Sequence, residues 1–262
     1  MKKLVALMLS LIMVLSLAAC GSNKDQTDLE AVKERGKLIV GITDYAPMDF
    51  KEKGNDEWVG FDADMAKAFA KELGVEVEFV EIDWDNKIME LDSGAIDCVW
   101  NGMTLTDEVT SAMDCSNPYC NNSQVVIVPK DKADKYQTVE SLAELNFVVE
   151  TGSAGEGAAE ANDLKFTPVD TQAKALFEVK SKTADAAIID ALMAGAMVGD
   201  KTDYADLTYT VSLGDEEFGV GFRKGSDLVK ALNDFFAASY EDGSMMKCAE
   251  KYGVQAAIIP QK

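Results

Sequence analysis

The hydrophobic pattern after residue 36 changes from the period of a strand to that of a helix and back. Residues 38–41 form a short β-type run, and in residues 61–73 apolar side chains recur three and four positions apart, as on one helix face. Gly74 follows, which is typical of a helix end, and residues 75–80 then alternate between polar and apolar. The order strand, helix, strand predicts an α/β layer with parallel strands.

One pattern occurs twice along the chain, at an offset of 88 residues. Residues 88–99 and 176–187 each have the pattern of a helix, a turn, an Asp and a buried strand, and a helix and strand precede each copy. Chance convergence of ordinary α/β patterning is the alternative explanation. Because ligands bind beyond the carboxyl ends of parallel strands, the strand ends at residues 101–102 and 189–190 predict one shared cleft.

Two further β-type runs, at residues 124–128 and 218–222, are predicted to cross between two lobes. Helical spacing returns at residues 228–236, and a last helix carries Met245, Met246 and Ala249. We therefore expect a first lobe of residues 36–125 plus 219–262 and a second lobe of residues 126–218.

The first twenty residues have the pattern of an export signal. Lys2 and Lys3 precede an apolar run that ends in Leu-Ala-Ala-Cys at Cys20, which is a bacterial lipobox. A transmembrane anchor is the alternative, although the run is short for a bilayer. We expect residues 1–19 to be a signal peptide, the Cys20 thiol to be acylated, and residues 20–35 to be a flexible tether. The protein would then be extracytoplasmic, anchored to the outer face of the membrane.

Composition narrows the chemistry further. The net charge of −21 argues against nucleic acid or anionic lipid as a partner of the folded body. The chain has no histidine, which excludes histidine-based nucleophile systems and histidine-ligated metal sites. The spacing of the cysteines after Cys20 matches no zinc motif and leaves open whether Cys115 and Cys120 are thiols or a disulfide. We predict no cofactor and no metal.

Several short motifs occur in one order along the chain after Cys20 and resemble the polar amino acid-binding proteins of ABC importers, extracellular solute-binding protein family 3. The matching stretches are residues 36–41, 60–65, 101–108, 116–119, 184–190 and 219–225. The resemblance implies a type II periplasmic-binding-protein fold, with two α/β lobes joined by two crossing strands. It also implies a monomer that is not an enzyme, holds an amino acid in the cleft and closes over it by hinge motion, with the permease subunits as partners.

The resemblance also assigns residues to the cleft. Tyr45 and Trp84 match aromatic walls around the ligand side chain, and Asp190 matches the carboxylate that takes the α-ammonium. The remaining matches are loops and neighbouring positions whose family counterparts contact the ligand: Asn101, Gly102 and Thr104 in the first lobe, Gly152 and Ser153 at a helix start in the second, and Asp44 and Glu150.

One position departs from the family pattern. After Thr106-Asp107-Glu108 the family usually has an arginine that grips the ligand carboxylate, and here the residue is Val109. The chain has two arginines, Arg35 and Arg223, in stretches expected away from the cleft. Either backbone N–H groups with Ser153 or Thr104 hold the carboxylate, or the ligand presents none there.

Acidic and aromatic residues expected at the cleft, among them Asp49 and Trp100, favour a cationic or neutral ligand over an acidic one. We therefore expect a solute receptor for an amino acid or a related amine. A secreted cyclohexadienyl or arogenate dehydratase on the same fold and a sensor domain are the alternatives.

Overall fold

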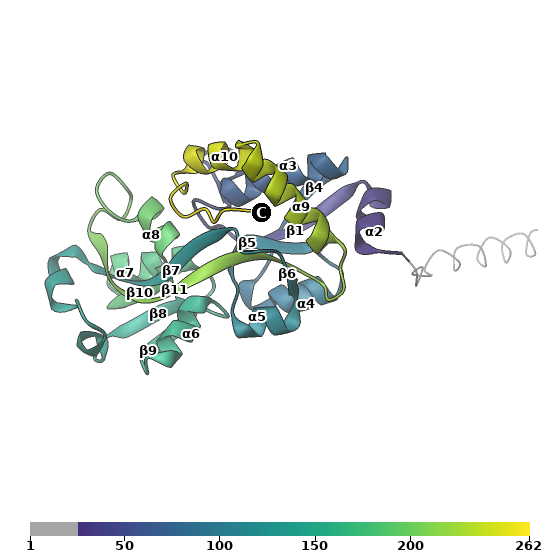
Figure 1. Cartoon of the computed structure of the whole chain (residues 1–262). Helices are drawn as coiled ribbons and strands as arrows, with labels where there is room; N and C mark the ends of the chain where they lie inside the picture. The colour runs from purple at the N-terminus through teal and green to yellow at the C-terminus, as the bar shows by residue number, and fades with distance from the viewer. Residues whose placement is uncertain (1–25) are drawn as a thin grey trace, which may run out of the picture.

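The computed structural model describes residues 26–262, so the predicted signal peptide and the acylation site at Cys20 lie outside the described residues. The chain forms an α/β protein with two lobes side by side (Figure 1). The first lobe contains a parallel sheet in the order β4, β1, β5, and the second a parallel sheet in the order β10, β8, β9. These strands are β1 (Lys37–Ile42), β4 (Glu76–Glu81), β5 (Cys98–Thr104), β8 (Asn146–Glu150), β9 (Lys165–Val169) and β10 (Ala186–Asp190).

Two long strands connect the lobes through the middle of the molecule. Strands β7 (Cys120–Pro129) and β11 (Leu207–Phe222) pair antiparallel, with β5 on the far side of β11 and β10 on the far side of β7. The predicted crossing runs were correct in place but too short, because the polar first part of β11 has no apolar periodicity. The exact lobe boundaries stay a prediction.

Helices cover both faces of each lobe (Figure 1). The repeated pattern appears as α4 followed by β5 and as α7 followed by β10. The helices are α3 (Phe61–Leu73), α4 (Lys87–Asp92), α5 (Asp107–Ala112), α9 (Leu228–Glu241) and α10 (Ser244–Tyr252) in the first lobe, and α6 (Ala154–Ala161), α7 (Gln172–Ser181) and α8 (Ala191–Met197) in the second. The shorter elements are 3₁₀ turns at Trp84–Asn86, Lys130–Lys135 and Val139–Leu142 and strands β2 (Phe50–Lys51), β3 (Trp58–Val59) and β6 (Asp114–Cys115).

The aspartate in each copy of the repeat has the same structural task. The Asp97 carboxylate accepts from the backbone N–H of Ile39 in β1 at 2.7 Å, and the Asp185 carboxylate accepts from that of Asn146 in β8 at 3.0 Å. Each aspartate thus joins the start of its own strand to the start of the neighbouring parallel strand.

Part of the predicted tether is a docked helix. Residues Asp28–Arg35 form α2, which begins with a capping box between Thr27 and Glu30. The Val32 side chain is fully buried, and the backbone N–H of Leu29 donates to Asp227 at 2.9 Å. The prediction of a flexible segment through residue 35 is therefore wrong for residues 28–35, because this helix packs on the first lobe.

No helix within residues 26–262 combines the length and the apolar character needed to cross a membrane. The four cysteines in this part of the chain, Cys98, Cys115, Cys120 and Cys248, are free thiols.

Candidate functional site

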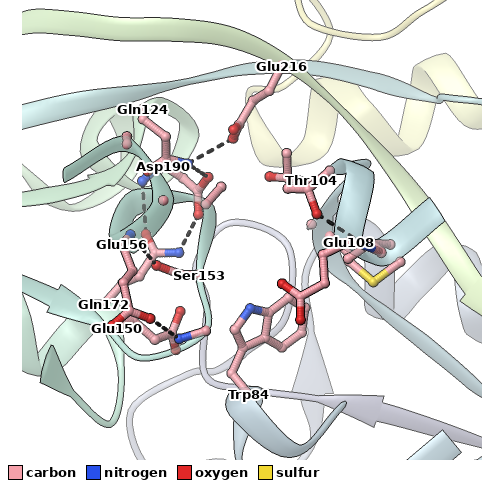
Figure 2. A pocket seen from close by; sticks show the side chains of 18 of the residues that line it. Trp84, Thr104, Glu108, Gln124, Glu150, Ser153, Glu156, Gln172, Asp190 and Glu216 are labelled. Atoms are coloured by element: carbon pink, nitrogen blue, oxygen red, sulfur yellow. Dashed lines mark hydrogen bonds between the residues drawn. The ribbon is translucent and has the colours of Figure 1, made fainter. Parts of the chain in front are cut away.

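A cavity of about 450 Å³ lies between the two lobes, a size typical of small-molecule sites. It lies beside the ends of β5 and β10, as the repeat predicted. Figure 2 shows Glu216, Gln124 and Asp190 gathered at one end of it and Trp84 at the other. Of the ten residues predicted to contact a ligand, nine line this cavity: Tyr45, Trp84, Asn101, Gly102, Thr104, Glu150, Gly152, Ser153 and Asp190.

Three acidic or aromatic residues that were expected at the cleft do not line it: Asp44, Trp100 and Asp49. The Asp44 side chain is exposed and does not line the cavity. Trp100 is 1% exposed and packs in the core, with ring centroids 6.3 Å from Phe69 and 5.6 Å from Phe236. Because successive side chains of a strand point to opposite faces, Trp100 on β5 points away from the cavity that its neighbour Asn101 lines.

The Asn101 side chain is held in place by hydrogen bonds to Thr43 and Asp49. Its Nδ2 donates to the Thr43 carbonyl at 3.0 Å and to the Asp49 carboxylate at 2.8 Å, and its Oδ1 accepts from the Thr43 hydroxyl at 2.6 Å. Asp49 is fully buried and does not line the cavity, so it is a structural partner of Asn101. These bonds occupy the Asn101 amide and leave the backbone at this strand end to face the cavity.

Gly102 allows the Tyr45 ring to enter the cavity wall. The φ angle of Gly102 is 55°, and a Cβ there would lie 2.5 Å from Tyr45 Cε1, so a larger residue would be strained and would displace the ring. The Tyr45 side chain is 3% exposed, and its hydroxyl has no hydrogen-bond partner among the described residues. A buried hydroxyl without a partner indicates that the cavity contents complete its hydrogen bonding.

Trp84 and Val109 form an apolar wall. Trp84 is 7% and Val109 3% exposed, and both belong to one apolar cluster with Met103 and Met113. Position 109 therefore lines the cavity as the family pattern implied, with a side chain that has no charge to offer a ligand.

The two arginines of the chain are bound at the other end of the first lobe. Arg35 forms a salt bridge with Asp97, and Arg223 lies 3.7 Å from the same carboxylate and donates to the Ile96 carbonyl at 2.7 Å. Neither arginine lines the cavity. The usual arginine clamp for a carboxylate is therefore missing from this cavity.

Asp190 and Glu216 form an acidic end of the cavity. Asn122 Nδ2 donates to Asp190 Oδ1 and to Glu216 Oε1, each at 2.5 Å, and Gln124 Nε2 donates to the same two oxygens, each at 2.8 Å. Burial and the neighbouring Glu216 carboxylate hold the pKa of Asp190 well above its usual range. The sequence prediction missed Glu216, because the acidic run at residues 215–217 looks like a solvated turn.

A second buried acid lies close to this end. Glu150 at the end of β8 is 4% exposed, and burial raises the pKa of its carboxyl to about 8. Gln172, in the first turn of α7, donates to the Asp190 carboxylate and accepts from the Asp190 backbone N–H at 2.9 Å. Gln172 fixes the Asp190 side chain in place, and beyond its position at a helix start no feature of the sequence pointed to this role.

The start of α6 is already occupied by a carboxylate of the chain. Glu156 accepts from the backbone N–H of Gly152 at 2.7 Å, and the Ser153 hydroxyl accepts from the backbone N–H of Glu156 at 3.2 Å. Gly152 and Ser153 line the cavity as predicted. However, Glu156 already binds part of the positive N-terminal end of α6, which was expected to favour a ligand carboxylate.

Lys87 connects the two lobes and is the one basic side chain among the described residues that line the cavity. Its ammonium donates to the Gly152 carbonyl of the second lobe at 2.8 Å and to the Trp84 carbonyl at 3.2 Å. Burial lowers the pKa of Lys87 from its ordinary value. Beside this contact, a Cβ on Gly152 would lie 2.8 Å from Asp85 Oδ1, so the two lobes touch here.

The balance of charge in the cavity is strongly negative. Eight acidic residues line it against the single Lys87: Asp107, Glu108, Glu150, Glu156, Glu160, Asp190, Asp215 and Glu216. A cavity with this lining attracts cations and repels anions.

Comparison with known proteins identifies the family. Residues 38–255 match the model of the bacterial extracellular solute-binding proteins, family 3. The chain belongs to this family. Two curated relatives of this family 3 protein are the arginine-binding extracellular protein ArtP of Bacillus subtilis, 30% identical over 96% of this chain and 98% of the relative, and the L-cystine-binding protein TcyJ of Escherichia coli, 32% identical over 92% of each.

Solved structures confirm the type II periplasmic-binding-protein fold for this family 3 chain. One is an ABC transporter substrate-binding protein of Streptococcus pneumoniae with bound histidine (TM-score 0.82, 30% identity, 89% of this chain and 99% of that one). Another is the ancestral amino acid-binding protein AncCDT-1, described as a precursor of cyclohexadienyl dehydratase (TM-score 0.78, 36% identity, 86% and 98%). These relatives are named as binding proteins, in agreement with the description of the family as extracellular solute-binding proteins.

Proposed function

We propose that this protein is the substrate-binding lipoprotein of an ABC importer and that it captures an amino acid with a basic or neutral side chain between its lobes. The observation that carries the proposal is a cavity with eight acidic lining residues and no arginine. A basic amino acid such as arginine fits this charge best, and relatives named for arginine and for histidine support that choice. The relative named for cystine keeps neutral amino acids in the test.

A cationic ligand also accounts for the buried acids. Asp190 and Glu150 have raised pKa values because burial penalises their charged forms. A ligand ammonium or guanidinium placed beside them would restore the favourable charged state. An acidic amino acid would add an anion to a cavity that already carries many, which makes glutamate and aspartate the poorest ligands.

The ligand carboxylate has few donors to bind. Val109 replaces the arginine, and the Gly152 N–H is committed to Glu156. We expect the Thr104 hydroxyl to hold it, because the N–H groups of Gly102 and Leu105 near the end of β5 already bond within the protein. An amine without a carboxylate, such as agmatine, should therefore lose less affinity here than in a relative with the arginine.

The test is a thermal-shift and calorimetry panel of L-arginine, L-lysine, L-glutamine, L-cystine, L-glutamate and agmatine. A ligand present at 100 times its dissociation constant stabilises the folded protein by about 2.7 kcal/mol, which is readily measured. The proposal predicts the largest shift with a basic amino acid and none with glutamate. A largest shift with glutamate would contradict it.

Val109→Arg sharpens the same test. A guanidinium at this position should bind a carboxylate bidentately, so the ratio of L-arginine to agmatine affinity should rise by about tenfold. Val109→Leu is the matched control, since it keeps the wall apolar. An unchanged ratio in the arginine variant would mean that the ligand carboxylate lies elsewhere.

The membrane anchor and the permease complete the proposal. The lipobox at Cys20 supports acylation and attachment to the outer face of the cell membrane, and the family supports delivery of the ligand to permease subunits by a monomer. Metabolic labelling with a fatty acid in the producing cells, with Cys20→Ala as the control, tests the anchor directly.

A further inference from the structure

The acidic end of the cavity contains two carboxylates where the family resemblance assigned one. Asp190 lies at the end of β10 and Glu216 lies on the crossing strand β11, directly opposite Asn122 on β7. Their oxygens share both amide donors, Asn122 Nδ2 and Gln124 Nε2, within 2.8 Å. Two carboxylates that share the same donors repel each other when both are ionised, so each disfavours the charged form of the other.

No cation in the described part of the chain supplies a compensating charge. Among residues 26–262 neither Asp190 nor Glu216 forms a salt bridge, and the acids nearest to Lys87 are Glu108, Asp85, Glu150 and Glu156. The other titratable groups around the pair are Glu150 on β8, Asp215 on β11, Cys120 on β7 and the Tyr45 phenol, and none of them is a cation.

Two buried polar atoms at the same end have no hydrogen-bond partner among residues 26–262. Gln124 is 4% exposed, and its Oε1 accepts no hydrogen bond; Tyr45 is 3% exposed, and its hydroxyl is unpaired. Both residues line the cavity. An oxygen acceptor beside two carboxylates is complementary to a group with several N–H donors, such as an ammonium or guanidinium.

We propose that Glu216 joins Asp190 in a two-carboxylate site that holds a shared proton when the cavity is empty and releases it when the cationic nitrogen of the ligand binds. Two carboxylates that share one proton are a known solution to this crowding. The exchange balances, because one proton leaves to solvent as one cationic group enters. It also means that affinity rises with pH wherever the empty site is protonated. This inference rests on the proposed function, since it specifies how the cation is recognised.

The test compares Glu216→Gln with Glu217→Gln. The glutamine at 216 keeps the side-chain shape and removes the charge, whereas Glu217 is the next residue on β11, is exposed and does not line the cavity. Calorimetry at pH 6 to 8 in phosphate and in Tris counts the protons released on binding, with whichever of L-arginine, L-lysine and L-glutamine binds the wild type most tightly as the probe.

We expect the wild type and Glu217→Gln to release close to one proton at the lower pH values, and Glu216→Gln to release far less and bind about tenfold more weakly. Equal affinity and equal proton release in the two variants would overturn the role of Glu216. If the affinity of the wild type does not change with pH, the proposed release of a proton on binding is wrong. This result does not depend on whether Glu216→Gln folds. Absence of binding by every probe would instead refute the proposed function.

Discussion

Two buried aspartates, Asp97 and Asp190, have different surroundings, one beside arginines and the other at the cavity between the lobes. Each is 3% exposed; Asp97 directly precedes β5, and Asp190 is the last residue of β10. Asp97 lies between Arg35 and Arg223, which are all the arginines of the chain. Asp190 has amide donors and a second carboxylate but no cation. The described part of the chain therefore neutralises one aspartate with its own arginines, and under the proposed function a cationic ligand would neutralise the other.

The largest effect is expected from Asp97→Asn, measured as loss of stability. The change leaves two arginines without their anion, and breaking such a partly buried network should lower the free energy of unfolding by about 3 kcal/mol. Urea unfolding monitored by circular dichroism measures it. Ligand affinity of the folded fraction should stay unchanged, and weakened binding without loss of stability would break the comparison.

Asp190→Asn should show the opposite pattern. Loss of this charged acceptor should weaken binding of a cationic ligand by roughly 100-fold. The unliganded variant should be at least as stable as the wild type, because it no longer buries a carboxyl with a raised pKa. Calorimetric titration and urea unfolding of the same sample measure both quantities. A marked loss of stability would mean that Asp190 is a structural residue like Asp97.

The pH dependence of the empty protein gives a third comparison. Burial raises the Glu150 pKa in the folded state to about 8 from its ordinary value of 4.5, so the folded protein binds more protons than the unfolded chain between these values. The Glu150 contribution to the free energy of unfolding should therefore decline as pH rises from 5 to 8, by up to about 1.4 kcal/mol per pH unit.

The matched control for this titration is Glu150→Gln, which should flatten the decline in urea unfolding midpoints across the same range. Identical slopes for the two proteins would show that Glu150 is ionised in the empty protein.

Lys87→Met should have the smallest effect, on ligand dissociation. The substitution keeps the apolar stem and removes the hydrogen bond to Gly152 in the other lobe, so the closed form should open about five times more readily. Stopped-flow dissociation with arginine, agmatine and glutamine should show the same factor for each. The control is Lys174→Met, at an exposed position of α7. A change in dissociation rate that differs between ligands would show that Lys87 contacts the ligand.

The local pattern of the sequence predicted much of the fold for clear reasons. Helix α3 has one apolar face and a glycine end, and β10 is a short fully buried run, so both are visible in a single stretch of sequence. The tether was the exception, although Thr27 and Glu30 have the spacing of a capping box. Polar composition suggested flexibility, but a short helix with one buried valine is enough to dock.

The site was harder to predict because its decisive contacts join distant residues. Asp190 was found through the family motif, whereas Glu216 lies in an acidic run whose strand pairing with Asn122 only the folded chain reveals. Lys87 was missed for the same reason, since its partner Gly152 is 65 residues away. The absence of an arginine clamp could be predicted, because it depends only on which residues the chain contains.

The docked α2 determines which lobe a membrane anchor would restrain. Helix α2 is fastened to the first lobe by the Asp28–Arg223 salt bridge at 3.1 Å and by the Leu29 N–H to Asp227. Residues 20–27 would then be the whole tether between an acylated Cys20 and α2. Eight residues span at most about 28 Å even when fully extended. The first lobe would stay close to the bilayer, while the second lobe would move to bind and release the ligand.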